Sequence, residues 1–262
     1  MYQDLTRGSI SRGLILFALP MVAGDLLQQF YNIADTLIVG QALGRNALAA
    51  VGSAYTLMTF LTSVFLGLSM GAGALFSIYL GRRDRGALHR AVGHAFVLIL
   101  SVTLVLTAGV YLLTDPILRF LQVPAELYDS MRAYLRIIFA GLPATFLYNF
   151  FACLLRAVGN SVVPLWFLGA AAVLNVGLDL LFVLVFHWGV AGAAIATVLA
   201  QYLSGVGIFL YACVRCRDLL PGRGELRFSA SVLRELLDLS LLTCAQQSAM
   251  NFGILLIQRL VD

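Results

Sequence analysis

Apolar stretches that are long enough to cross a lipid bilayer recur along the whole chain. A helix of about 20 apolar residues spans the roughly 30 Å hydrocarbon core of a membrane. Seven such stretches occur in the 262 residues, near 14–39, 56–80, 91–113, 134–155, 164–187, 190–214 and 232–260. The sequence therefore predicts an all-α protein, a polytopic bundle of transmembrane helices in a plasma membrane or bacterial inner membrane.

The composition excludes most other classes. Hydrophobic residues make up 61% of the chain and charged residues only 11%, whereas a soluble domain carries roughly 25% charged residues. The net charge of +4 comes from arginines in short clusters between apolar runs, a pattern typical of membrane topology and not of a nucleic-acid-binding face. No nucleophile–base set, metal cluster or cofactor loop is recognisable, so we expect neither an enzyme nor a bound cofactor. Cys213 and Cys216 have CxxC spacing without a second pair, which favours coincidence over a metal or redox site.

The arginines alternate between the connections. The N-terminus, the second loop and the sixth loop are rich in arginine, whereas the intervening loops are poor in it. Because cytoplasmic loops carry the excess of Lys and Arg, we expect a cytoplasmic N-terminus. The arginines concerned are Arg7, Arg12, Arg82, Arg83, Arg85, Arg90, Arg156, Arg215, Arg217, Arg223 and Arg227.

A polar segment divides the chain. Residues 215–231 contain Pro-Gly-Arg-Gly and are predicted to be a cytoplasmic linker. The division gives a six-helix N-terminal transmembrane lobe over 1–214 and the first helix of a truncated C-terminal lobe over 232–262. That last helix is expected to have no bundle to pack against. Gln246-Gln247 in it faintly repeats Gln28-Gln29 of the first span, as duplicated transporter bundles do.

Small residues in the second span indicate helix packing. Gly67, Ser69, Gly71 and Gly73 form a small-xxx-small surface of the kind through which membrane helices approach one another. A nucleotide-binding loop would need a preceding strand and a soluble domain.

Polar side chains inside the spans are the candidate functional residues, because a charge in the membrane is costly. Gln28, Tyr31, Asn32 and Asp35 share one helix face, and Asn175 and Asp179 share another. Asp35, Asp179 and Thr197 are each predicted to lie about 7–12 Å below the outer surface, from the 1.5 Å rise per residue. Two carboxylates in a poorly solvated pocket would hold a proton, or a sodium ion through oxygen ligands. The alternative is that each Asp only hydrogen-bonds a neighbouring helix.

Two further residues carry structural expectations. Pro20 inside the first span should kink the helix or let it bend, which makes that helix a candidate moving part. Arg156 is expected at the end of the fourth span, where it would snorkel to the membrane interface instead of contacting a substrate.

The order and spacing of these features resembles the multidrug and toxic compound extrusion (MATE) transporters, in particular their DinF-like branch, along the whole chain. The resemblance rests on motifs in four places. They are Pro20, Gln28-Gln29, Tyr31, Asp35, Val39-Gly40, Gly44 and Leu48-Ala49-Ala50-Val51-Gly52 in and after the first span; Leu155-Arg156-Ala157-Val158-Gly159-Asn160 with Pro164; Asn175, Asp179 and Phe182; and Gly192-Ala193-Ala194-Ile195-Ala196-Thr197.

The resemblance implies a transporter of two six-helix lobes around a V-shaped cleft, which exports cationic amphiphilic compounds in exchange for H⁺ or Na⁺. It implies an ion site at Asp35, Asn175, Asp179 and Thr197, with Gln28, Tyr31 and Asn32 in the substrate cavity and a helix hinge at Pro20. The implied partners are membrane lipid, small organic cations and a C-terminal lobe that this chain lacks. The rivals are a flippase for lipids or lipid-linked oligosaccharides, which should carry cationic residues in its cavity, and a truncated membrane module without transport activity.

Overall fold

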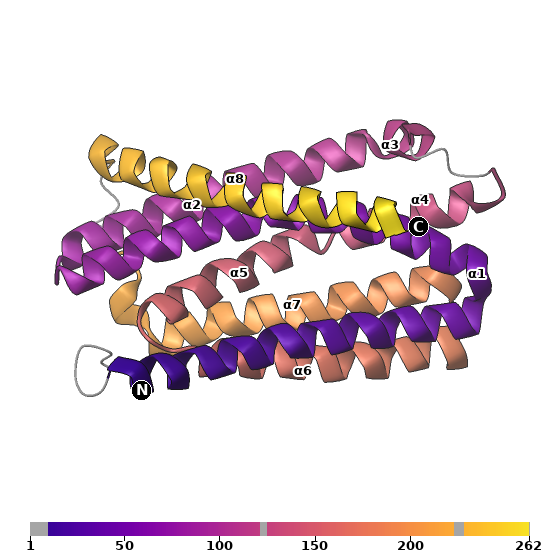
Figure 1. Ribbon diagram of the computed structural model, residues 1–262, viewed down its shortest axis with the longest axis horizontal. Helices are drawn as coiled ribbons and strands as arrows, with labels where there is room; N and C mark the ends of the chain where they lie inside the picture. Colours follow the sequence, from indigo (N-terminus) through magenta and orange to yellow (C-terminus); the bar gives the residue numbers. More distant parts are fainter. Residues whose placement is uncertain (1–9, 121–124, 223–227, 262) are drawn as a thin grey trace.

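The computed structural model describes residues 10–120, 125–222 and 228–261. This part of the chain is helical and contains no strand, which confirms the predicted all-α class. The helices run side by side along the long axis of the molecule (Figure 1). Of the arginines used to predict topology, Arg7, Arg223 and Arg227 lie outside the described residues. The elements are α1 (Ile10–Gly81), α2 (Arg85–Leu112), α3 (Thr114–Phe120), α4 (Ala125–Phe139), α5 (Leu142–Ala157), α6 (Val162–Asp179), the π-helical turn η1 (Leu180–Val185), α7 (Gly189–Arg215), the 3₁₀ turn η2 (Arg217–Leu219) and α8 (Ala230–Val261).

Helix α1 contains the first two predicted spans. The expected loop between them is helical, and the chain reverses direction at Gly44, where φ is 82° and ψ is −176°. A residue without a Cβ adopts this positive φ without strain, which explains the glycine. Figure 1 shows the two halves of α1 running along different sides of the bundle, joined at one end.

Six described segments are long and apolar enough to cross a membrane. They are Ser11–Ala42, Met58–Gly81, Arg85–Leu112, Tyr128–Ala157, Val162–Val185 and Gly189–Arg215, and they correspond to the first six predicted spans. The fourth combines α4 and α5, which are separated by a turn at Ala140 and Gly141. The predicted seventh span forms helix α8.

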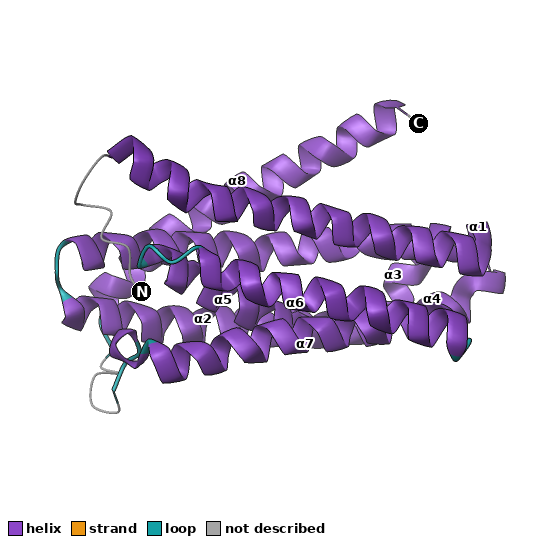
Figure 2. Ribbon diagram, turned by 90° about the horizontal axis from the view of Figure 1, so that it is seen from below, coloured by secondary structure: helices purple, strands orange, loops and turns teal. Residues whose placement is uncertain are grey.

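The expectation that the last helix lacks a packing partner is wrong. α8 packs along the second half of α1. The backbone of α8 at Cys244 and Ser240 lies so close to Gly67 and Gly71 that a Cβ on either glycine would overlap it. Across this interface Thr243 Oγ1 donates to the Gly67 carbonyl at 2.7 Å. Small residues therefore bring these helices together, and Figure 2 shows the C-terminal end of α8 leaning away from the rest of the bundle.

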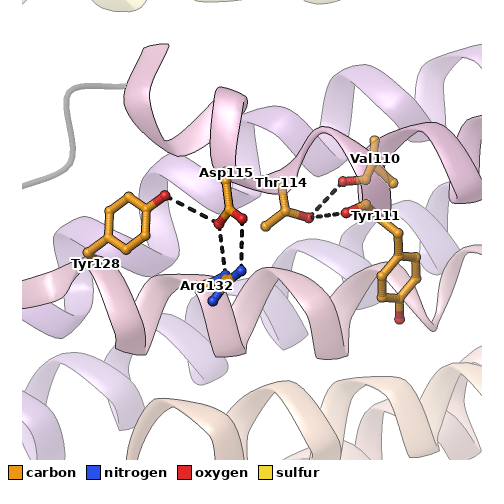
Figure 3. Close-up of polar contacts among 6 residues, drawn as sticks. All are labelled: Val110, Tyr111, Thr114, Asp115, Tyr128 and Arg132. Atoms are coloured by element: carbon orange, nitrogen blue, oxygen red, sulfur yellow. Dashed lines mark hydrogen bonds and ion pairs between the residues drawn. The ribbon is translucent and has the colours of Figure 1, made fainter.

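A polar clamp joins α3 to the beginning of the fourth span. Arg132 contacts Asp115 through two atoms, with Nε 2.8 Å from Oδ1 and Nη2 2.8 Å from Oδ2. The Tyr128 hydroxyl donates to the same carboxylate at 3.2 Å (Figure 3). Because both charged side chains are more than one-third exposed, the clamp contributes at most about 1 kcal/mol. It fixes the end of the bundle where α1 reverses.

Much of the interior is apolar. Aromatic rings from α2 and α5 meet in one cluster, in which Phe96 lies 5.4 Å from Phe150 and Phe150 lies 5.1 Å from Phe151, measured between ring centroids. The outward-facing side chains are apolar as well, such as Leu112 and Val105, which are 81% and 70% exposed. An exterior of this kind matches lipid.

Candidate functional site

A polar cavity of about 370 Å³ lies among the helices. The first half of α1 lines it from Pro20 to Asp35, and a smaller recess of about 130 Å³ shares Gln28 and Thr197 with it. The other polar side chains of its wall come from several helices: Thr59, Thr62, Ser63, Tyr134, Thr145, Tyr148, Asn149, Arg156, Ser161, Gln201 and Gln247.

Asp35 lines this cavity and contacts Asp179 of a separate helix, which is buried and does not itself line the cavity. Asp35 is half-buried and Asp179 is fully buried. Their carboxyl groups lie within side-chain hydrogen-bonding contact of each other. One oxygen of each carboxyl, Oδ1, is buried without a hydrogen-bond donor among the described residues. Two ionised carboxylates can only accept hydrogen bonds, so this contact requires a proton or a cation between the two groups.

Asn175 and Thr197 lie beside the carboxyl pair. In one orientation of the Asn175 amide, Nδ2 donates to Thr197 Oγ1 at 3.3 Å. In the opposite orientation Nδ2 donates to Asp179 Oδ2 at 3.1 Å, and the amide oxygen accepts from the Thr197 backbone N–H at 3.3 Å. The second orientation satisfies both ends of a buried amide next to a carboxylate, so we take it as the resting arrangement.

The local sequence explains how these groups converge. Asn175 and Asp179 are four residues apart in α6 and therefore stack on one face. The backbone becomes π-helical directly after Asp179, at Leu180–Val185, and such turns often occur at functional sites. Small residues of α7, Ala193 and Ala194, are buried as well. Thr197 Oγ1 donates to the Ala193 carbonyl at 3.0 Å, which fixes its rotamer.

The other predicted site residues line the same cavity. Gln28, Tyr31 and Asn32 share the α1 face with Asp35, as the helical spacing predicts, and all three contribute to the wall. Pro20 lies further along the same wall. The backbone stays helical at Pro20. The residue of α1 with non-helical torsion angles is Gly44.

Sequence reasoning missed Tyr134 and did not expect Arg156 in the cavity wall. Tyr134 is 6% exposed, lines the cavity and interacts electrostatically with Asp35 and Asp179. A tyrosine in an apolar run gives no distinguishing signal in the sequence. Arg156 lies in the last turn of α5, as predicted, but its side chain lines the cavity, and its Nε is buried without an acceptor among the described residues.

The donor set around the carboxyl pair fits a small hard cation or a proton. Carboxylate, amide and hydroxyl oxygens are the ligands that such ions prefer. No cluster of three or more His, Cys, Asp or Glu that could hold a metal ion occurs in the described ranges, so a transition-metal site is not supported there.

The fold and the cavity define a multi-pass membrane protein with a polar chamber inside its helix bundle. Comparison with known families is consistent with this class and narrows it. The sequence profile of the MatE family matches residues 20–181, which is more than half of the chain. The chain therefore belongs to the MatE family of multidrug efflux transporters, which are multi-pass proteins of the bacterial cell membrane and not enzymes.

Individual relatives agree with the family. The chain is 34% identical to the probable multidrug resistance protein YpnP of Bacillus subtilis over 208 residues, covering 79% of this chain and 46% of YpnP. It is 26% identical to the probable multidrug resistance protein NorM of Thermotoga maritima over 253 residues, covering 94% of this chain and 54% of NorM. A solved MATE structure in complex with MaL6 matches with a TM-score of 0.90 at 25% identity, covering 97% of this chain and 56% of that one. The chain thus spans about half the length of the curated relatives it matches.

Proposed function

We propose that the chain forms the N-terminal lobe of a secondary active efflux transporter that exports cationic amphiphilic compounds in exchange for H⁺ or Na⁺. The ion site consists of Asp35, Asn175, Asp179 and Thr197. The substrate cavity is the polar chamber beside it, with Gln28, Tyr31 and Asn32 in its wall.

One observation carries the proposal. The carboxyl group of Asp35, which lines the cavity, contacts that of the buried Asp179, and each keeps a buried oxygen without a donor among the described residues. Such a pair binds one small cation readily and is unfavourable without it. Binding therefore draws Asp35 of α1 toward Asp179 of α6, and ion release loosens the contact. If the ion and the substrate prefer different arrangements of α1, ion binding and substrate binding are coupled.

The remaining features complete the proposed cycle. Residues 1–214 form the lobe, 215–231 a cytoplasmic linker, and 232–262 the first helix of a second lobe. The arginine-rich α1–α2 connection and the end of α7 lie at the same end of the bundle as the start of α1 (Figure 1), which supports a cytoplasmic N-terminus. Pro20 is the point where α1 bends when the ion site changes. A second lobe supplies the other wall of the cleft that alternating access requires.

The test is export by the full-length protein in everted membrane vesicles. Asp35→Asn and Asp179→Asn keep the shape of the side chain but remove the charge. Each is expected to lower ion-driven export of a fluorescent organic cation by about tenfold or more, because a contact with a charged group is worth about 1.5–3 kcal/mol. Asp238→Asn is the matched control, since Asp238 is exposed on α8 and lies outside the cavity.

Undiminished ion-coupled export by both site variants, at equal amounts of protein in the membrane, would refute the ion site. Running the assay with a proton gradient alone and then a sodium gradient alone identifies the coupling ion.

A further inference from the structure

The cavity has a second charged end, which the proposed ion site does not use. Arg156, in the last turn of α5, lines the cavity. Its Nε is buried without a hydrogen-bond acceptor among the described residues. A guanidinium carries five donors and stays charged, so a buried orphan donor on it costs stability unless a bound group satisfies it.

Protein groups near Arg156 do not neutralise it. Asp25 is the other charged side chain at this end of the cavity, and it is exposed. Among the described residues, no ion pair within 4.0 Å joins the two. Among the described residues, no ion pair within 4.0 Å joins Arg156 to Asp35 or Asp179 either.

The beginning of α6 adds positive potential at the same place. Ser161 precedes α6 and lines the cavity, but its hydroxyl does not cap the helix. It donates instead to the Phe17 carbonyl of α1 at 2.9 Å. Among the first N–H groups of α6, that of Val163 donates to Asn160 Oδ1 at 3.1 Å. A helix N-terminus carries partial positive charge, so the beginning of α6 adds to the positive charge of Arg156.

We propose that Arg156 binds an anionic group, a carboxylate or a phosphate, on the exported amphiphile. The cavity then receives compounds that carry charges of both signs, with the anionic group at Arg156 and the cationic group toward Asp35. A planar guanidinium matches the paired oxygens of both anions. This inference rests on the proposed export function and adds a specificity-determining residue to it.

The experiment compares two dyes that differ in one group. A rhodamine ethyl ester is a permanent cation, and the corresponding free acid is a zwitterion with the same ring system. Equilibrium binding of both is measured by fluorescence polarisation, using the full-length protein in phosphatidylcholine nanodiscs at neutral pH. Arg156→Gln should weaken binding of the acid by about 10- to 100-fold, the worth of a hydrogen-bonded charge pair, and leave binding of the ester within about twofold.

Two further variants serve as controls. Arg156→Lys keeps the charge without the planar fork and should recover part of the affinity for the acid. Arg136→Gln removes an exposed arginine outside the cavity and should change neither dye. The acid-to-ester affinity ratio is insensitive to the fraction of folded protein, so partial misfolding of one variant does not decide the outcome.

The outcomes separate this inference from the function it rests on. An unchanged acid-to-ester ratio in Arg156→Gln overturns the anion site while ester binding still supports the proposed function. Failure of the wild-type protein to bind either dye overturns both. Competitors that displace the acid dye from the wild-type protein but not from Arg156→Gln identify the kind of anion that Arg156 binds. Displacement by phosphatidylglycerol added to the nanodisc indicates a lipid headgroup. Displacement by inorganic phosphate or acetate in solution indicates a free or drug-borne anion.

Discussion

Replacing Gly71 with alanine tests whether α8 packs on α1 as the structure has it. A Cβ at Gly71 would overlap the Cα of Ser240 and lie 2.7 Å from its backbone nitrogen. Ordinary van der Waals distances begin at 3.4 Å. Because the atoms it meets belong to the backbone of α8, no side-chain rotation relieves the overlap, and the two helices must separate.

The magnitude follows from the packing and the hydrogen bonds at this interface. Overpacking of this kind costs about 1–3 kcal/mol. Separation also weakens the hydrogen bonds from Thr243 to the Gly67 carbonyl, at 2.7 Å, and from Ser240 to the Leu68 carbonyl, at 3.2 Å. Bonds between membrane helices are worth about 0.6 kcal/mol each. We expect Gly71→Ala to lower the free energy of unfolding by about 2–4 kcal/mol relative to a matched control.

The control is Gly109→Ala in α2. A Cβ at Gly109 meets nothing within 4 Å. Gly109→Ala gains about 0.5–1 kcal/mol in helix propensity, as Gly71→Ala does. The measurement is reversible unfolding in mixed micelles with increasing dodecyl sulfate, followed by the helical circular dichroism signal. Equal unfolding free energies for the two variants would show that α8 does not lie on this face of α1.

Two further predictions concern the site. Thr197→Val should weaken binding of the coupling ion by about fivefold, because removing a hydroxyl ligand costs roughly 1 kcal/mol, whereas Thr197→Ser should leave it unchanged. The ion concentration for half-maximal export measures both effects, and the same concentration in both variants would remove Thr197 from the site. Pro20→Ala restores a backbone donor for the carbonyl four residues earlier and stiffens α1, so export should slow while helical content is retained; a normal export rate would count against the hinge.

The helical spans were predictable because lipid imposes a simple rule. A segment that crosses the membrane must be apolar for about 20 residues, so hydropathy alone marked six spans that the structure contains. The shared face of Gln28, Asn32 and Asp35 was predictable for a similar reason, since positions in one helix follow from its period.

The relations between helices were not predictable in this way. The reversal at Gly44 between the two halves of α1, the docking of α8 and the π-helical turn after Asp179 depend on packing between distant segments. Arg156 shows the limit most clearly. Its position at the end of an apolar run favoured the membrane interface, whereas in the structure its side chain lines the cavity.

By itself the sequence determined the class of protein, the first six apolar spans and which polar residues share a helix face, because these properties depend on local composition and the helical period. The tertiary structure alone decided that Asp35 contacts Asp179, that Tyr134 stands beside them and that Arg156 faces the same chamber. Side chains from helices far apart in sequence meet only when packing sets the rotation and depth of each helix, and no local pattern encodes those two quantities.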